Sequence, residues 1–358
     1  MQFSRLQLNN LRKYIEIFKK FSKSERYKQG ISEREKRKKF YQSFTASKIK
    51  KMDEYEFTQF IGKLWASEMF TNKEYRVRMI IASNGFDKLK KELVNLLYAK
   101  KEPERRYEDF LKRIKYLGPS SITEILCYVY PQRCGIWNDR ARKALKILGF
   151  NNLPLNKYKI SAKEYKRFNE VIFKISQELR KAGFKNVDLL FTDYFLYNIW
   201  RFSKEKESFE KIKKVEKEVL SFDHEEIKEK IYQIGLWLGF EAETEKAISK
   251  GARVDVIWRA KIGNLGLVNY VFEVQKRGSI DSLILNLQKA KKNPTVQKLV
   301  VVSNKEQIEK LKEEVEDLDE SFKRALTYWE VEKVQKVHDN LSEIIEIIDD
   351  LGLIQKEF

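Results

Sequence analysis

The sequence predicts two folded parts, an all-α N-terminal domain and a C-terminal α/β domain with a mixed sheet and the core order αβββαβ. Apolar residues recur at three- and four-residue spacing through residues 1–203. Beyond residue 223, short β-type runs alternate with helical stretches. The charge divides at the same point. Residues 1–222 hold 51 Lys and Arg against 27 Asp and Glu, whereas residues 223–358 hold 21 against 26.

Helical periodicity is clearest at residues 56–70, 86–99 and 160–184. The last of these begins at Ser161 with Glu164 three residues on, which predicts a capping box. Residues 22–51 carry many Lys and Arg but few apolar side chains, so we expect a solvated basic arm or helix.

The positive excess of residues 1–222 indicates a polyanion as partner, because Lys and Arg gain affinity for phosphates through counterion release. DNA is the expected partner. A basic membrane-surface protein is the competing interpretation, but the sequence offers no strongly amphipathic terminal helix for it. We therefore expect no membrane partner.

A helix, a tight turn and a second helix are predicted over residues 107–150, with the turn at Gly118-Pro119. Backbone N–H groups at the second helix start, together with Ser120 and Ser121, would form a phosphate cradle. The segment resembles a helix-hairpin-helix, a DNA-backbone clamp, but Tyr116 stands where that motif usually has its first glycine. A plain αα-hairpin is the alternative.

Residues 130–150 resemble the segment that follows the hairpin in helix-hairpin-helix DNA glycosylases. Asn138 stands where those enzymes carry a catalytic Asp, and Ser120 where some carry a Schiff-base Lys. Both departures argue against glycosylase chemistry, although the adjacent Asp139 keeps it open. A helical module of restriction systems is also similar. It implies that the DNA-contacting or structural residues are Trp137, Asn138 and Arg140.

A charged helical linker is predicted at residues 204–222, before the α/β domain of residues 223–358. The helix after it places Ile227, Ile231, Ile234 and Leu238 on one face. We then expect strands at 240–246, 253–260 and 268–275, a helix at 279–292, a strand at 298–304, and helices at 305–318 and 339–350.

Single carboxylates interrupt two of these apolar strands. Asp255 lies in "RVDVIWRA", and Glu273 lies in "VFEVQ" on the same strand face as Gln275. A carboxylate in an apolar strand is costly to bury without a cation. Two such strands side by side would place both carboxylates around a hard divalent cation. The alternative is a pair of partly exposed carboxylates with Arg or Lys partners.

The order of elements and these residues together resemble the PD-(D/E)xK nuclease superfamily, with Asp255 at the first acidic position and Glu273-Val274-Gln275 as the (D/E)xK segment. The resemblance implies a restriction-endonuclease-like fold and Mg²⁺, with Mn²⁺ as a substitute, bound by Asp255, Glu273 and the Val274 carbonyl. Gln275 replaces the usual Lys that orients the attacking water. Lys276 should point to the opposite strand face unless a bulge intervenes.

The family often adds a carboxylate from its first helix, and helix phase favours Glu226 over Glu229. A solvated carboxylate is the simpler interpretation of Glu226. Gln288 resembles the polar helix residue of the methyl-directed branch of the family. In the same helix, Asp281, Ser282 and Asn286 are candidate DNA contacts, and Ser279 is expected to cap the helix start.

Two cysteines, Cys127 and Cys134, are expected to be buried reduced thiols, because two histidines in the chain make a zinc cage improbable. Neither a secretory signal nor an apolar run long enough for a bilayer is evident, so we expect a cytoplasmic protein. A charged fraction of 35% fits a thermophilic source.

The resemblance implies a magnesium-dependent endonuclease that hydrolyses DNA phosphodiester bonds in restriction or DNA repair. The alternatives are a helix-hairpin-helix glycosylase-like repair protein and a restriction-associated DNA-binding factor that does not cleave. A single nuclease centre cuts one strand, so double-strand cleavage would require a homodimer or two binding events.

Overall fold

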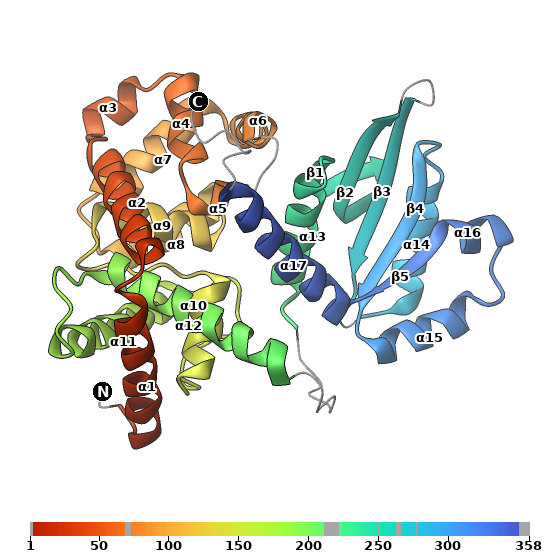
Figure 1. Ribbon diagram of the computed structural model, residues 1–358. Helices are drawn as coiled ribbons and strands as arrows, with labels where there is room; N and C mark the ends of the chain where they lie inside the picture. Colours follow the sequence, from red (N-terminus) through yellow and green to blue (C-terminus); the bar gives the residue numbers. More distant parts are fainter. Residues whose placement is uncertain are drawn as a thin grey trace. The chain divides into compact units, whose positions relative to one another are not determined.

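The computed structural model describes residues 3–68, 73–210, 222–249, 251–262, 266–276 and 278–350 (Figure 1). A helical N-terminal region is followed by an α/β region with a five-stranded mixed sheet, which confirms the predicted fold class at that level. Two compact units result, residues 1–67 with 77–219 and residues 68–76 with 220–358. Of the predicted linker, residues 211–221 lie outside the described residues.

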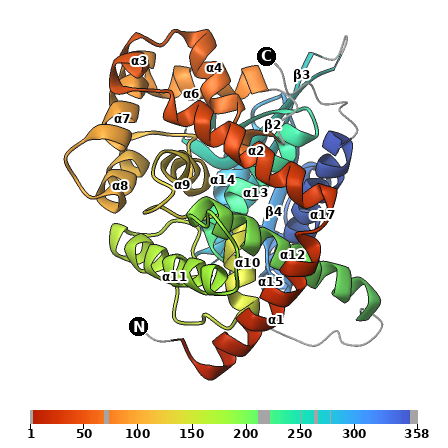
Figure 2. The same cartoon turned by 60° about the vertical axis from the view of Figure 1, so that its left-hand side comes forward.

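The helical region contains α1 (Arg5–Phe21), α2 (Glu25–Gln42), α3 (Ala46–Lys51), α4 (Glu54–Gly62), α5 (Trp65–Glu68), α6 (Lys73–Asn84), α7 (Phe86–Tyr98), α8 (Pro103–Arg113), α9 (Pro119–Val129), α10 (Asp139–Ile147), α11 (Ala162–Lys181) and α12 (Leu189–Glu210). Ser161 and Glu164 form the predicted capping box. In both views α10 and α12 lie side by side (Figure 2). None of the described helices is both long and apolar enough to cross a bilayer.

The basic segment 22–51 is less solvated than expected. It forms α2 and α3, and α2 buries Tyr41 completely. The Tyr41 ring stacks on Tyr128 of α9 at 4.7 Å, and its hydroxyl donates to the Phe60 carbonyl at 2.6 Å. Arg34 is buried between the rings of Trp65 and Tyr194. Of the two predicted forms, arm or helix, the segment is helical, and these few large side chains hold α2 against the core.

The turn between α8 and α9 keeps the backbone form that a glycine would favour. Tyr116 has a φ of 65°, in the left-handed region that non-glycine residues rarely adopt. Asn84 fixes the residue before it, accepting from the Lys115 N–H at 2.8 Å and donating to the Lys115 carbonyl at 3.0 Å. A side-chain clamp thus stabilises the strained turn.

The α/β region contains α13 (His224–Trp237), β1 (Glu241–Ser249), β2 (Ala252–Ile262), β3 (Gly266–Val274), α14 (Ile280–Lys291), β4 (Val296–Ser303), α15 (Lys305–Val315), α16 (Glu320–Ala325), β5 (Leu326–Glu330) and α17 (Val331–Asp350). The spatial strand order is β1-β2-β3-β4-β5. Neighbours from β1 to β3 are antiparallel, and the pairs β3–β4 and β4–β5 are parallel.

Helices cover the two faces of the sheet differently (Figure 1). Ile257 and Val271 belong to a core with α14 on one face. On the other face, Trp258 Nε1 donates to the Ile231 carbonyl of α13 at 3.0 Å. The sequence prediction missed β5, a five-residue strand that begins directly after α16 and ends directly before α17. Leu238 is 53% exposed, because it follows the last residue of α13 as the C-cap.

Replacing Gly118 with alanine should destabilise the helical region. The φ of Gly118 is −81°, which any residue adopts, so the requirement is one of space. A Cβ there would lie 2.2 Å from the Tyr158 hydroxyl, and the next ring atom is at 3.3 Å. Urea unfolding of Gly118→Ala should show a loss of about 1–3 kcal/mol, typical of overpacking. Adding Tyr158→Phe should recover most of it; a neutral Gly118→Ala would contradict the packing.

Candidate functional site

The register of β2 and β3 brings the two predicted carboxylates together. The antiparallel ladder ends at the pair Val256–Phe272, so Asp255 and Glu273 are opposite each other one step beyond it. Opposed residues of antiparallel strands share a face. The same face carries Ile257, two residues after Asp255, and Val271, two residues before Glu273, and both belong to the core with α14. The strand pattern therefore predicted this pair correctly.

The Asp255 carboxylate replaces the missing ladder bond. Its Oδ2 accepts from the Val274 N–H at 2.8 Å, which ties the start of β2 to the end of β3. The same oxygen lies 3.2 Å from His224 Nε2. Hydrogen bonding to Asp255, and then to Glu225, raises the pKa of His224 to about 10. His224 is therefore an imidazolium at neutral pH and compensates the Asp255 charge.

Glu273 is held from α14. Asn286 Nδ2 donates to Glu273 Oε1 at 2.8 Å and also to the Arg253 carbonyl at 2.8 Å. Burial, and next the neighbouring Asp255 carboxylate, raise the pKa of Glu273. A second negative charge beside Asp255 is therefore unfavourable unless a cation is bound. A raised carboxylate pKa beside a like charge is the kind of perturbation that functional sites often show.

Gln275 lies at the end of β3 and is fixed through its backbone. Its N–H donates to the Val302 carbonyl at 2.8 Å, and its carbonyl accepts from the Ser303 hydroxyl. Lys276 Nζ lies over the ring of Phe222, at 5.8 Å from the centroid. The register shift between β3 and β4 falls at Asn269 and Tyr270, away from this end of β3.

The two supporting residues from the helices have other neighbours. Glu226 forms an ion pair with Lys230 at 3.1 Å. The start of α13 instead contributes His224, which the sequence argument missed because it considered only carboxylates from this helix. Gln288 is half-buried in α14 and lies about 200° around the helix from Asn286. Asn286, expected as a DNA contact, is the residue of α14 that bonds Glu273.

A divalent cation fits this site through few protein ligands. The described residues contain no cluster of three or more His, Cys, Asp or Glu side chains arranged for a metal ion. Asp255 and Glu273 supply two carboxyl groups on facing strands, and Mg²⁺ commonly uses one or two carboxylates and several waters. The donor set thus suits Mg²⁺ better than zinc.

The predicted phosphate cradle of α9 is only partly accessible. Gly118 is the N-cap and lies against Tyr158, and Ser120 is half-buried. Ser121 is 3% exposed, so its hydroxyl faces the interior rather than a phosphate. The expectation that Ser121 joins the cradle was wrong, because the apolar face of α9 turns it inward with Ile122.

Residues 137–140 serve mainly to hold helices together. Asn138 caps α10 by accepting from the Ala141 N–H at 2.7 Å, and its amide donates to Asp193 Oδ1 at 3.3 Å. The Arg140 guanidinium lies over the rings of Tyr197 and Trp200.

Trp137 is a core residue with 2% exposure, and its Nε1 donates to the Tyr158 carbonyl. Asp139, the residue that kept glycosylase chemistry open, pairs with Arg142 and Lys143. Cys127 and Cys134 are buried free thiols, as predicted.

The chain matches no protein-family model, no curated protein and no solved structure. What its residues do must therefore be argued from the site itself.

A double-mutant cycle tests the His224–Asp255 pair. His224→Ala and Asp255→Asn, singly and together, should show a favourable coupling in urea unfolding of the α/β region without metal. We expect about 1 kcal/mol, since His224 is 35% exposed and solvent screens the pair. The exposed pair Glu306–Lys310 is a matched control that should show no measurable coupling. Additive effects at His224 and Asp255 would contradict the ion pair.

Asp193 should make the stability of the helical region depend on pH. Burial raises its pKa to about 6, against the opposing effects of Arg34 and Asn138. Because the folded pKa exceeds the unfolded one, this contribution is fully present below about pH 4 and is lost as pH rises through 6. Urea unfolding across this window should show a shallower decline for Asp193→Asn than for wild type. If the unfolding free energies of wild type and Asp193→Asn changed equally with pH, the proposed contribution of Asp193 would be contradicted.

Proposed function

We propose that the protein is a divalent-metal-dependent endonuclease that hydrolyses DNA phosphodiester bonds. The observation that supports this most is that Asp255 and Glu273 lie opposite each other just beyond the last paired residues of β2 and β3. The pKa of Glu273 is raised there. Carboxylates so placed in an αβββαβ core resemble the PD-(D/E)xK nuclease centre. The restriction-endonuclease-like fold is part of this proposal.

In the proposed site, Asp255, Glu273 and the Val274 carbonyl hold Mg²⁺, or Mn²⁺ in its place. When bound there, the ion would supply activation of a water and stabilisation of charge on the phosphate. Asn286 orients Glu273 through its 2.8 Å hydrogen bond. Gln275 follows Glu273 on the same strand face and positions the attacking water through its amide.

The positive excess of residues 1–222 supplies the attraction to DNA. Part of the basic set is structural, as buried Arg34 and Arg142 show, so the exposed Lys and Arg carry the phosphate contacts. A single centre cuts one strand, and double-strand breaks would need a homodimer or two binding events. Restriction and repair are both consistent with these residues.

Supercoiled plasmid incubated with the purified protein and Mg²⁺ or Mn²⁺ should become nicked, and EDTA should prevent it. Asp255→Ala should lower the rate by about 100-fold or more, because losing even an indirect partner of a metal costs about 10–100-fold. Asp139→Ala is the control in the helical region and should leave cleavage unchanged.

Wild-type protein that cleaves none of plasmid, branched, damaged and modified DNA, with either metal, would refute the nuclease proposal. A protein that still binds DNA under those conditions would be the non-cleaving restriction-associated factor. Base excision lost in Asp139→Ala would instead favour the glycosylase.

A further inference from the structure

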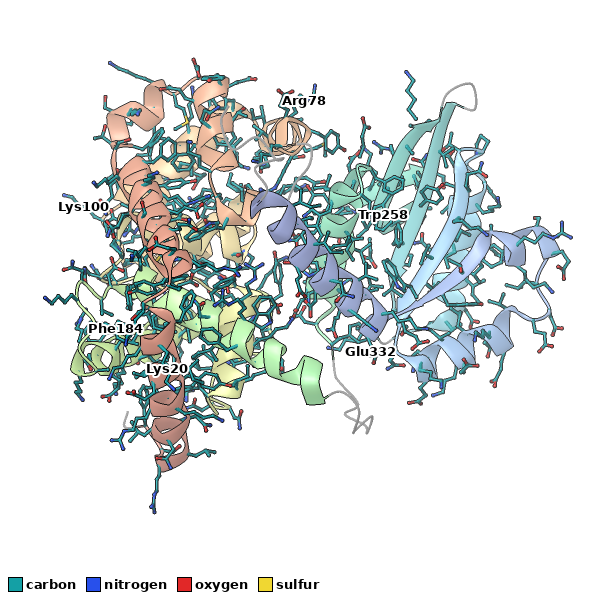
Figure 3. All side chains as sticks on the ribbon, in the orientation of Figure 1. Lys20, Arg78, Lys100, Phe184, Trp258 and Glu332 are labelled. Carbon is teal, nitrogen blue, oxygen red and sulfur yellow. The ribbon has the colours of Figure 1, made fainter. Side chains whose placement is uncertain are left out.

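The α/β region has an aromatic groove on the sheet face opposite the two carboxylates. The groove has a volume of about 380 Å³. Its lining comes from the end of α13 and from four strands, namely Phe240, Trp258, Tyr270, Phe272, Lys298, Val300, Thr327, Tyr328 and Trp329. Figure 3 labels Trp258, which lies on β2. Five of these nine residues belong to one continuous set of touching rings.

The five rings differ in how deeply they are buried. Trp258 and Phe272 are buried and lie 4.3 Å apart between centroids, whereas Phe240, Tyr270 and Trp329 are half-buried. Phe240 stacks on Trp258 at 5.3 Å and meets Tyr270 edge-on at 5.8 Å. These contacts fix the ring planes before any ligand arrives. Three aromatic faces or edges therefore stay accessible at the rim of the groove.

The charge at the rim is positive. Lys298 is exposed and crosses directly from Tyr270 in the sheet register. None of the described residues that line the groove is acidic, although residues 223–358 carry a net negative charge. Stacking surfaces beside a cation complement an aromatic ring that carries a phosphate.

We infer that this groove binds an unstacked base of single-stranded DNA, with the neighbouring phosphate toward Lys298. Aromatic stacking with nearby cations is how proteins hold single strands without reading their sequence. An open groove lets the strand enter and leave, and the helical region offers the positive charge that draws DNA to the chain. The choice of DNA rests on the proposed function, but the groove and the carboxylates lie on different faces and can be tested separately.

The test measures binding of a short single-stranded oligonucleotide carrying one 2-aminopurine to the full chain, in EDTA. Tyr270→Leu should weaken binding about tenfold and remove the quenching of 2-aminopurine fluorescence, since losing one stacked base typically costs that much. Tyr270→Phe keeps the ring and should remain within about twofold of wild type. Leu267→Ala is the matched control, because Leu267 is 44% exposed on the same strand outside the groove.

The charge contact has its own readout. Lys298→Gln should reduce the slope of log affinity against log salt by about 0.7, the value for one phosphate contact on a single strand. Tyr270→Leu should leave that slope unchanged. Thermal unfolding of each variant shows whether it stays folded, and the exposed Lys298→Gln keeps the inference testable if Tyr270→Leu unfolds.

Equal binding by wild type, Tyr270→Leu and Tyr270→Phe would overturn the inference. So would equally tight binding of a free mononucleotide, which would make the groove a nucleotide site, or self-association that Tyr270→Leu abolishes, which would make it an interface between copies. Because binding is measured in EDTA, failure of plasmid cleavage would leave the groove result intact, and loss of 2-aminopurine quenching would leave the nuclease result intact.

Discussion

The α/β region depends on how it tolerates two carboxylates side by side at one end of its central strands. Burying like charges together is unfavourable unless other groups compensate them. His224 supplies a positive charge to Asp255, the Val274 N–H supplies a hydrogen bond, and Asn286 supplies one to Glu273. Hydrogen bonds to the two carboxylates therefore hold the start of α13, the end of β3 and the middle of α14 in place.

In the helical region, buried charged side chains are also compensated by their neighbours, here by aromatic rings and backbone N–H groups. Arg34 is buried between two aromatic rings, at 4.2 Å from Trp65 and 3.9 Å from Tyr194. Glu124 accepts from the Trp65 and Ala66 N–H groups, while burial raises its pKa to about 7. Charge in this region therefore has two uses. Some of it joins helices in the interior, and the exposed remainder is the part that we propose contacts DNA.

The sequence predicted those parts of the fold and site whose signal is local. Two apolar strands with one acid each located β2, β3 and the carboxylate pair, and Ser161 with Glu164 located a helix start. His224 escaped prediction because its partner Asp255 lies 31 residues away and its role depends on where α13 meets the sheet.

Tertiary packing, which sets how each helix is rotated and which strands pair, explains the other differences between prediction and structure. Asn286 rather than Gln288 bonds Glu273 because the rotation of α14 over β3 is set by packing, which no residue in α14 reveals alone. Ser121 looked available to a phosphate, but the fold turns it inward. The strand β5 has only five residues and pairs with β4, so its signal is tertiary.

The carboxylate site is compact in the chain as well as in space. Its hydrogen bonds span sequence separations of 31, 19 and 13 residues, whereas Gln7 in α1 reaches the Gly149 carbonyl across 142. Short separations cost little loop-closure entropy, and contacts of this kind form early in folding. During synthesis, His224, Val274 and Asn286, which bond the two acids, all emerge before β4 and β5. The later strands, β4 and β5, extend the sheet. The four side chains of the site, His224, Asp255, Glu273 and Asn286, all precede them in the chain.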